Sequence, residues 1–285
     1  MRIKTIFLCT TSLLSGVLLA SASLAADLYI EGTPVQPTVL PAVSGINGKI
    51  AAQGGSFDDE GFGVFTGSIS VPLGTRYGFQ GDAIAGVRDG EFVGGIGGHL
   101  FWRDPSTALL GVVGSFTQRE DIDGHVARLG VEGEYYWNQW TVRSLLGAEF
   151  LDAGNAFANV DDGFFAFSDV SYYLNDNLQL SVGHRYTRER NALALGAEFQ
   201  LDQQMFSSGV SLFAEGRIGE DDYQAVWGGV RFYLGDDKTL IRRHREDDPE
   251  GLGDEDLFEV DACDSASGGC GSESGGGGSQ TIIVD

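Results

Sequence analysis

Ser168 and His184 are a nucleophile and a base on either side of a short polar turn, Asn175-Asp176-Asn177. If this turn joins two antiparallel strands, counting outward from it sets Ser168 opposite His184 on one surface of the sheet. A serine beside a histidine hydrolyses esters when a third group orients the histidine. The neighbouring segments place no Asp, Glu or Asn on that surface, so the pair lacks an expected orienting group.

Charged residues form a second set, and they recur at alternate positions of one parity through most of the chain. The set comprises Lys49, Asp82, Arg88, Arg128, Glu132, Glu134, Arg143, Glu149, Asp169, Arg185, Glu198, Glu215, Arg217 and Arg231. The opposite parity of the same segments carries no Asp, Glu, Lys or Arg. Charge confined to one parity predicts strands with one polar and one apolar face.

The dipeptide Asn138-Gln139 predicts a two-residue hairpin turn, which would set the register of the strands around it. In that register Glu134 faces Arg143. Arg128 likewise faces Glu149. Such pairs fit two interpretations, the lining of a narrow polar pore or braces across a filled interior.

Histidine and cysteine spacings do not predict a metal site. His99 and His125 each stand alone, without ligands at metal-binding intervals. Beyond the N-terminal segment only Cys263 and Cys270 remain, and in an oxidising compartment we expect a local disulfide between them. The chain also lacks a Walker motif and a dinucleotide fingerprint. We therefore expect no metal, no cofactor and no enzymatic activity.

The elements that position the charged residues are predicted to be short strands. From residue 43 onward, apolar and polar residues alternate between turns rich in Gly, Asp, Asn and Pro. The expected strands are 44–54, 62–73, 76–88, 91–103, 108–119, 125–137, 140–151, 163–174, 178–188, 192–201, 209–218 and 223–234. The predicted fold class is all-β, a closed antiparallel transmembrane β-barrel of about 12 strands over residues 43–235.

A soluble β-sandwich also alternates, and two further features favour the membrane barrel. The uncharged face is rich in Gly and Ala, which suit lipid tails better than a sandwich core, whereas the charged face suits a polar lumen. Aromatic residues of the uncharged face gather at one end of the strands, as at a membrane interface. These predicted interface residues are Trp102, Trp137, Trp140 and Tyr172.

The first residues indicate export. Basic residues precede an apolar run that ends near Ala20, and small residues then allow cleavage after Ala25. At about 15 residues the run is too short to span a hydrocarbon core of roughly 30 Å. We therefore expect a signal peptide at 1–25 and a Pro-containing periplasmic leader at 26–42. The net charge of −23 argues against nucleic acid as a partner.

Residues 236–285 break the alternation. This segment has 14 acidic against four basic residues and becomes rich in Gly and Ser. Low hydrophobicity with high charge predicts a largely disordered tail, which we place in the periplasm with the N-terminus. The breaks after odd-numbered strands are acidic and include the longest, 152–162, so we expect them to be extracellular loops that attract cations.

The signal peptide, the alternating region and the aromatic strand end Arg231-Phe232-Tyr233-Leu234 together resemble the bacterial outer-membrane β-barrel (porin-like) superfamily. The resemblance covers residues 43–235 and is one of pattern, so it implies location and architecture without a particular activity. In that superfamily the last strand, ending in an aromatic residue, is read by the assembly machinery. Here residues 236–285 follow that strand, which departs from the family pattern.

Three functions are compatible with these features. The first is a narrow passive pore for small polar or cationic solutes, since twelve strands leave modest room inside. The second is a non-conducting structural barrel of the envelope whose tail contacts a periplasmic partner. The third is an outer-membrane lipid hydrolase that uses Ser168 and His184. Expected partners are outer-membrane lipids and lipopolysaccharide, with divalent cations at the acidic loops.

Overall fold

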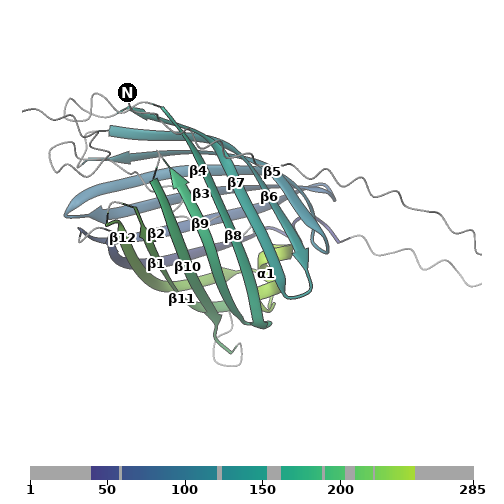
Figure 1. The fold of residues 1–285 in the computed structure, drawn as a ribbon. Coiled ribbons are helices and arrows are strands. Elements are labelled where there is room, and N and C mark those ends of the chain that lie inside the picture. Colours follow the sequence, from purple (N-terminus) through teal and green to yellow (C-terminus); the bar gives the residue numbers. More distant parts are fainter. Residues whose placement is uncertain are drawn as a thin grey trace, which may run out of the picture. The chain divides into compact units, whose positions relative to one another are not determined.

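Twelve β-strands and one short helix form the described part of the chain (Figure 1). The structure, a computed structural model, describes residues 40–57, 60–120, 124–152, 162–187, 190–202, 209–220 and 222–247. The strands are β1 (Asn47–Phe57), β2 (Glu60–Leu73), β3 (Tyr77–Arg88), β4 (Glu91–Asp104), β5 (Ala108–Arg119), β6 (Gly124–Trp137), β7 (Trp140–Asp152), β8 (Gly163–Asn175), β9 (Leu178–Thr187), β10 (Arg190–Gln200), β11 (Gly209–Gly219) and β12 (Gln224–Leu234).

The strands form a closed barrel. Each pairs antiparallel with its neighbours in sequence, and β1 closes the ring against β12, from Gly48 opposite Leu234 to Phe57 opposite Ala225. Closure gives every edge a hydrogen-bonding partner, which a sheet at membrane depth requires. The expected closed antiparallel barrel of about twelve strands is confirmed. Each strand begins and ends within three residues of the position expected from the sequence. The described residues contain no helix long and apolar enough to cross a membrane.

Side chains alternate between the outside and the inside of the barrel. On β12, Val226 is 60% exposed on the outside, whereas Trp227 is 2% exposed on the inside. Large apolar residues such as Phe65 and Leu129 cover the outer surface. The inside also holds an apolar cluster of Val64, Ile84, Val93, Val113, Leu145, Phe165 and Phe167. Bulky side chains therefore occupy part of the space that the strands enclose.

The two ends of the barrel differ in their connections. At one end, which we call the turn end, five connections follow even-numbered strands, and four of them are short turns, at 74–76, 105–107, 138–139 and 176–177. Gly74 and Asn138 adopt φ of +77° and +50° in these turns, a left-handed conformation that Gly and Asn tolerate. At the other end, the loop end, the connections follow odd-numbered strands. Because β1 begins and β12 ends at the turn end, the chain enters and leaves the barrel there.

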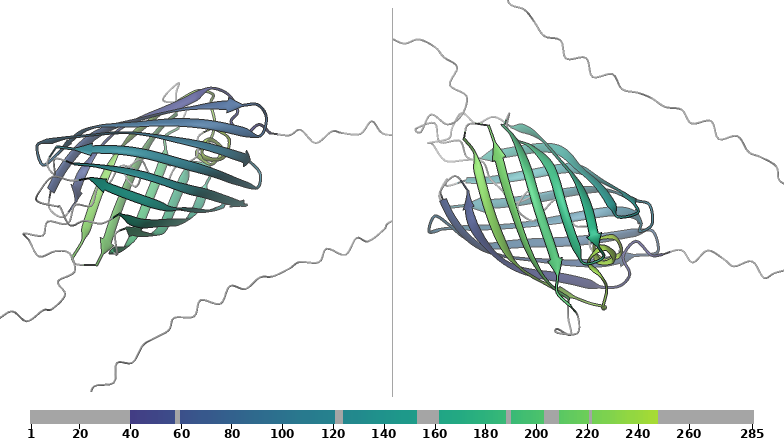
Figure 2. Two further views of the ribbon diagram at one scale, coloured as in Figure 1. Left: turned by 90° about the horizontal axis from the view of Figure 1, so that it is seen from above. Right: turned by 60° about the horizontal axis from the view of Figure 1, so that its bottom comes forward.

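A helix, α1 (Leu240–Glu246), follows β12 at the turn end (Figure 2). Its side chains Leu240, Arg243 and His244 are buried. The sequence pattern did not predict this helix, because four of its seven residues carry basic or imidazole side chains and the segment shows no apolar periodicity. The beginning of the tail is thus ordered against the barrel.

Several predicted segments lie outside the described residues. They are the signal peptide, the leader up to residue 39 and the tail from residue 248, including the predicted disulfide pair Cys263 and Cys270. Their assignments stay predictions.

The seam between β1 and β12 depends on a close approach at Gly55. A Cβ added there would overlap the backbone oxygen of Val226 and lie 2.6 Å from the Cα of Trp227. We expect Gly55→Val to lower the free energy of unfolding by about 1–3 kcal/mol, as overpacking does. The measurement is denaturant titration of tryptophan fluorescence in detergent. Gly63→Val is the control, since a Cβ at Gly63 meets nothing within 4 Å. Equal unfolding midpoints for the two variants would contradict the prediction.

Candidate functional site

The inner face of the barrel carries the fourteen charged residues that the sequence predicted to line a lumen. Three of them, Arg88, Glu132 and Glu215, are half-buried. The others are buried and are Lys49, Asp82, Arg128, Glu134, Arg143, Glu149, Asp169, Arg185, Glu198, Arg217 and Arg231. Because isolated buried charges are costly, their partners decide whether this face is a pore lining or a brace.

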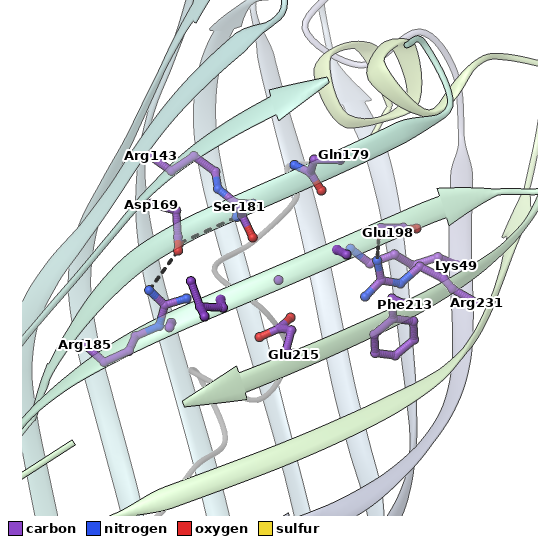
Figure 3. A pocket seen from close by; sticks show the side chains of 14 residues that line it. Lys49, Arg143, Asp169, Gln179, Ser181, Arg185, Glu198, Phe213, Glu215 and Arg231 are labelled. Atoms are coloured by element: carbon purple, nitrogen blue, oxygen red, sulfur yellow. Dashed lines mark hydrogen bonds and ion pairs between the residues drawn. The ribbon is translucent and has the colours of Figure 1, made fainter. Parts of the chain in front are cut away.

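Many of these charged side chains form ion pairs with side chains of a neighbouring strand. Arg128 faces Glu149 as predicted, and its guanidinium forms an ion pair with that carboxylate. Asp169 lies between two arginines, with its Oδ1 3.0 Å from Arg185 Nη1 and its Oδ2 3.6 Å from Arg143 Nη2 (Figure 3). Arginine and carboxylate side chains thus link β6 to β7 and β8 to both of its neighbours.

Glu134 and Arg143 also face each other in the predicted register. The Glu134 carboxylate, however, accepts a hydrogen bond from Tyr136 Oη at 2.7 Å. In another part of the inner face, Glu198 on β10 pairs with Arg231 on β12 and accepts a hydrogen bond from Tyr233 Oη at 2.7 Å. Tyrosine hydroxyls therefore share the carboxylates with the arginines, a detail that register alone did not predict.

His99 joins two carboxylates on the inner face. Its Nε2 lies 3.2 Å from Asp82 Oδ2, and its Nδ1 lies 2.9 Å from Glu132 Oε2. The interpretation of His99 as a lone histidine missed these contacts, because its two partners lie on β3 and β6, distant in sequence from the middle of β4. Among the described residues no group of three or more His, Cys, Asp or Glu side chains is arranged to hold a metal ion.

Arginines of the inner face also stack on aromatic rings. Arg217 Cζ lies 4.7 Å from the ring centroid of Trp227, and Arg128 Cζ lies 5.8 Å from that of Phe165. Arg103, fully buried, lies 4.8 Å from the ring centroid of Phe101. Cation–π contacts of this kind hold guanidinium groups in place and narrow the interior.

A polar cavity lies inside the barrel, against the inner face of β1 and of β7 to β12 (Figure 3). Its volume is about 30 Å³, measured as the space that water molecules can occupy. Charged side chains line it, among them Lys49, Asp169, Glu198, Glu215 and Arg231. A cavity of this size holds about two water molecules.

The predicted interface aromatics lie at the turn end of the barrel. Trp137 and Trp140 flank the 138–139 turn and are 61% and 40% exposed. The ring centroids of Trp140 and Tyr172 are 4.6 Å apart, and Trp102 is half-buried near the end of β4. Rings with one polar atom at this level suit the headgroup region of a membrane.

Ser168 faces His184 on the outer surface, in the predicted register. The expectation that no orienting group exists is wrong, because His184 Nε2 lies 3.0 Å from Asn191 Oδ1. Glu220 holds that amide through hydrogen bonds of 2.8 Å and 2.9 Å to its backbone and side-chain nitrogens. Asn191 was missed because β10 begins at Arg190, two residues before the expected strand. Among the described residues, no hydrogen bond joins Ser168 to His184.

No family model and no curated protein matches the chain. The KdgM porin has a similar structure, with a TM-score of 0.51 and 9% identity over 66% of this chain and 99% of that one. This chain has the outer-membrane β-barrel fold. Omp33 of Acinetobacter baumannii is also similar to it, with a TM-score of 0.39 and 10% identity over 66% of this chain and 98% of Omp33. So is outer-membrane phospholipase A of Escherichia coli, with a TM-score of 0.41, 14% identity and coverage of 67% and 93%.

The Arg128–Glu149 pair is expected to stabilise the barrel. Glu149 is 1% exposed, so Glu149→Gln leaves the Arg128 guanidinium buried beside a neutral amide. We expect this variant to lower the free energy of unfolding by about 3–5 kcal/mol, as removal of one partner of a buried ion pair does. Denaturant titration measures the loss. The control is Arg76→Gln, which removes the half-exposed pair with Asp104 near the solvent and should cost about 0–1 kcal/mol. Equal losses in the two variants would contradict this role of Glu149.

Proposed function

We propose that the chain forms a narrow passive pore for small polar solutes, cations among them. The observation that carries the proposal is the charged inner face of the barrel, with a polar, water-sized cavity among its arginines and carboxylates. Ion-paired side chains leave room for water and small solutes and exclude larger ones. The apolar outer surface and the barrel neighbours support an outer-membrane location.

Carboxylates at the loop end support the preference for cations. Glu60, Asp89, Glu91, Glu220 and Asp222 lie at the strand ends and turns there, most of them exposed. Clustered negative charge raises the local concentration of cations at a pore mouth. The same carboxylates would bind divalent cations that bridge to the phosphates of lipopolysaccharide.

We also propose that the turn end faces the periplasm, with both termini on that side. Short turns are typical of the periplasmic side of such barrels, and longer loops of the extracellular side. The ordered segments before β1 and after β12 both lie at the turn end. In this orientation the tail beyond α1 would meet a periplasmic partner.

A non-conducting structural barrel is the second candidate. The buried ion pairs, the cation–π contacts and the small cavity volume all favour a braced interior. The two functions make opposite predictions for the passage of ions, because a braced interior without a continuous water path carries no current.

Planar-bilayer recording of the purified protein separates these two functions. We expect discrete channel steps of small conductance. In a salt gradient, the zero-current voltage should shift toward the equilibrium potential of the cation. The physical reason is the narrow charged interior beneath a negatively charged mouth. Absence of discrete steps over a wide range of voltages would reject the pore and favour the structural barrel.

The contact between Asn191 and His184 favours a third candidate, a hydrolase that acts on lipids at the outer surface. A hydrolase needs the serine hydroxyl within reach of the histidine, and here Ser168 and His184 only share a register. We therefore expect unchanged phospholipid and lipid A profiles when the protein is overproduced. Labelling by a serine-directed probe that is lost in both Ser168→Ala and His184→Ala would establish the hydrolase instead.

A further inference from the structure

The segment after β12 turns back across the turn end of the barrel. Gly235 adopts φ of +129°, which lets the chain reverse direction, and α1 follows after residues 236–239. Leu240 is fully buried and packs with Tyr173 and Tyr233, which both lie on the inner face. Figure 2 shows α1 near the ends of the strands at this side of the barrel. The helix therefore packs on inner-face residues at the mouth, away from the outer wall.

Polar contacts hold α1 to several strands at once. His244 Nδ1 lies 2.7 Å from Tyr173 Oη on β8, and its Nε2 lies 3.1 Å from Tyr233 Oη on β12. Arg243 Nε donates to Gln200 Oε1 on β10 at 3.0 Å. Arg245 donates to the backbone oxygen of Asn138 at 2.9 Å, in the turn between β6 and β7. One short helix thus contacts the rim from β6 to β12.

The segment before β1 covers the other part of the rim. Ala42 N donates to the backbone oxygen of Thr75 at 2.8 Å, in the turn between β2 and β3. Val43 is 1% exposed and packs with Phe101, Leu109 and Tyr136, which lie on β4, β5 and β6. Residues 42–46 and α1 therefore reach complementary halves of the same mouth.

Direct contacts join these two segments. Ser44 N donates to the backbone oxygen of Glu246 at 2.8 Å, and Lys238 Nζ donates to Ser44 Oγ at 2.6 Å. Lys238 also forms ion pairs with Asp247 and, at 3.4 Å, with Glu246. Burial alone would raise the pKa of the Glu246 carboxyl, but hydrogen bonds from Arg242 and Lys238, together with the charges of these two side chains, hold the pKa below its ordinary value.

We propose that residues 42–46 and 238–247 form a mouth plug that limits passage through the pore, and that withdrawal of α1 opens it. The proposal rests on the pore function proposed above. The closed ring of paired strands consists of β1 to β12 and does not include α1, so the helix can leave while the strands stay paired. Most of its contacts are polar, and hydrogen bonds to the rim are exchanged for hydrogen bonds to water when the helix leaves. The sequence continues from 248 to 285, so a partner that binds this segment would act directly on α1.

The test uses the full chain with two substitutions inside the mouth plug, Arg243→Ala together with His244→Ala. They remove the polar contacts of Arg243 and His244 with β8, β10 and β12 and leave every strand residue in place. Arg242→Ala is the matched control, because that side chain is 57% exposed and, among the described residues, its ion pair and hydrogen bonds go to Glu246 of the same helix. Tryptic cleavage after Arg245, followed over time, reports release of the helix in all three proteins. Heat-dependent gel mobility reports that the barrel has formed.

We expect faster cleavage of the double variant and a several-fold rise in its single-channel conductance or open fraction, with the control equal to the unaltered protein. Faster cleavage with unchanged conductance would overturn the mouth plug while leaving the pore intact. Unchanged cleavage with unchanged conductance would also overturn it, because Arg243 and His244 would then not hold the helix. If no protein conducts although cleavage is faster, the pore function itself fails.

Discussion

The hydrogen bonding between β1 and β12 is the constraint on which the rest of this structure depends. A sheet whose outer surface is apolar cannot leave edge N–H and C=O groups without partners at membrane depth, so the first and last strands must meet. Their pairing requires an even number of strands in antiparallel order and a close approach at Gly55. It also requires that the chain enters β1 and leaves β12 at the same end of the barrel. The division into a turn end and a loop end follows from it.

Closure also decides what the inner face has to do. Twelve strands enclose a space into which every second side chain points, and charges in that space need partners. The arginines meet this need in two ways, through carboxylates such as Glu149 and Asp169 and through rings such as Trp227. The result is an interior that is polar and braced at once.

The charged parity of the sequence was sufficient to predict the architecture and the neighbours across a tight turn. Arg128 opposite Glu149 could be predicted because a two-residue turn leaves one register. The position of His99 between Asp82 and Glu132 could not be predicted. Its side chain reaches Glu132 on β6, and no single turn sets the register between β4 and β6. Asn191 was missed for a simpler reason, because strand boundaries are the least certain part of a periodic pattern.

By itself, the sequence determined that the chain is a barrel and which residues face inward, because a two-residue period and the exclusion of charge from lipid are properties of local order along the chain. Only the tertiary structure decided how the interior is used. Residues far apart in sequence come together where Asp169 pairs with two arginines, where arginines stack on rings, and where Ser44 N donates to the backbone oxygen of Glu246 in α1. Such contacts arise from closure of the ring, which no local pattern describes.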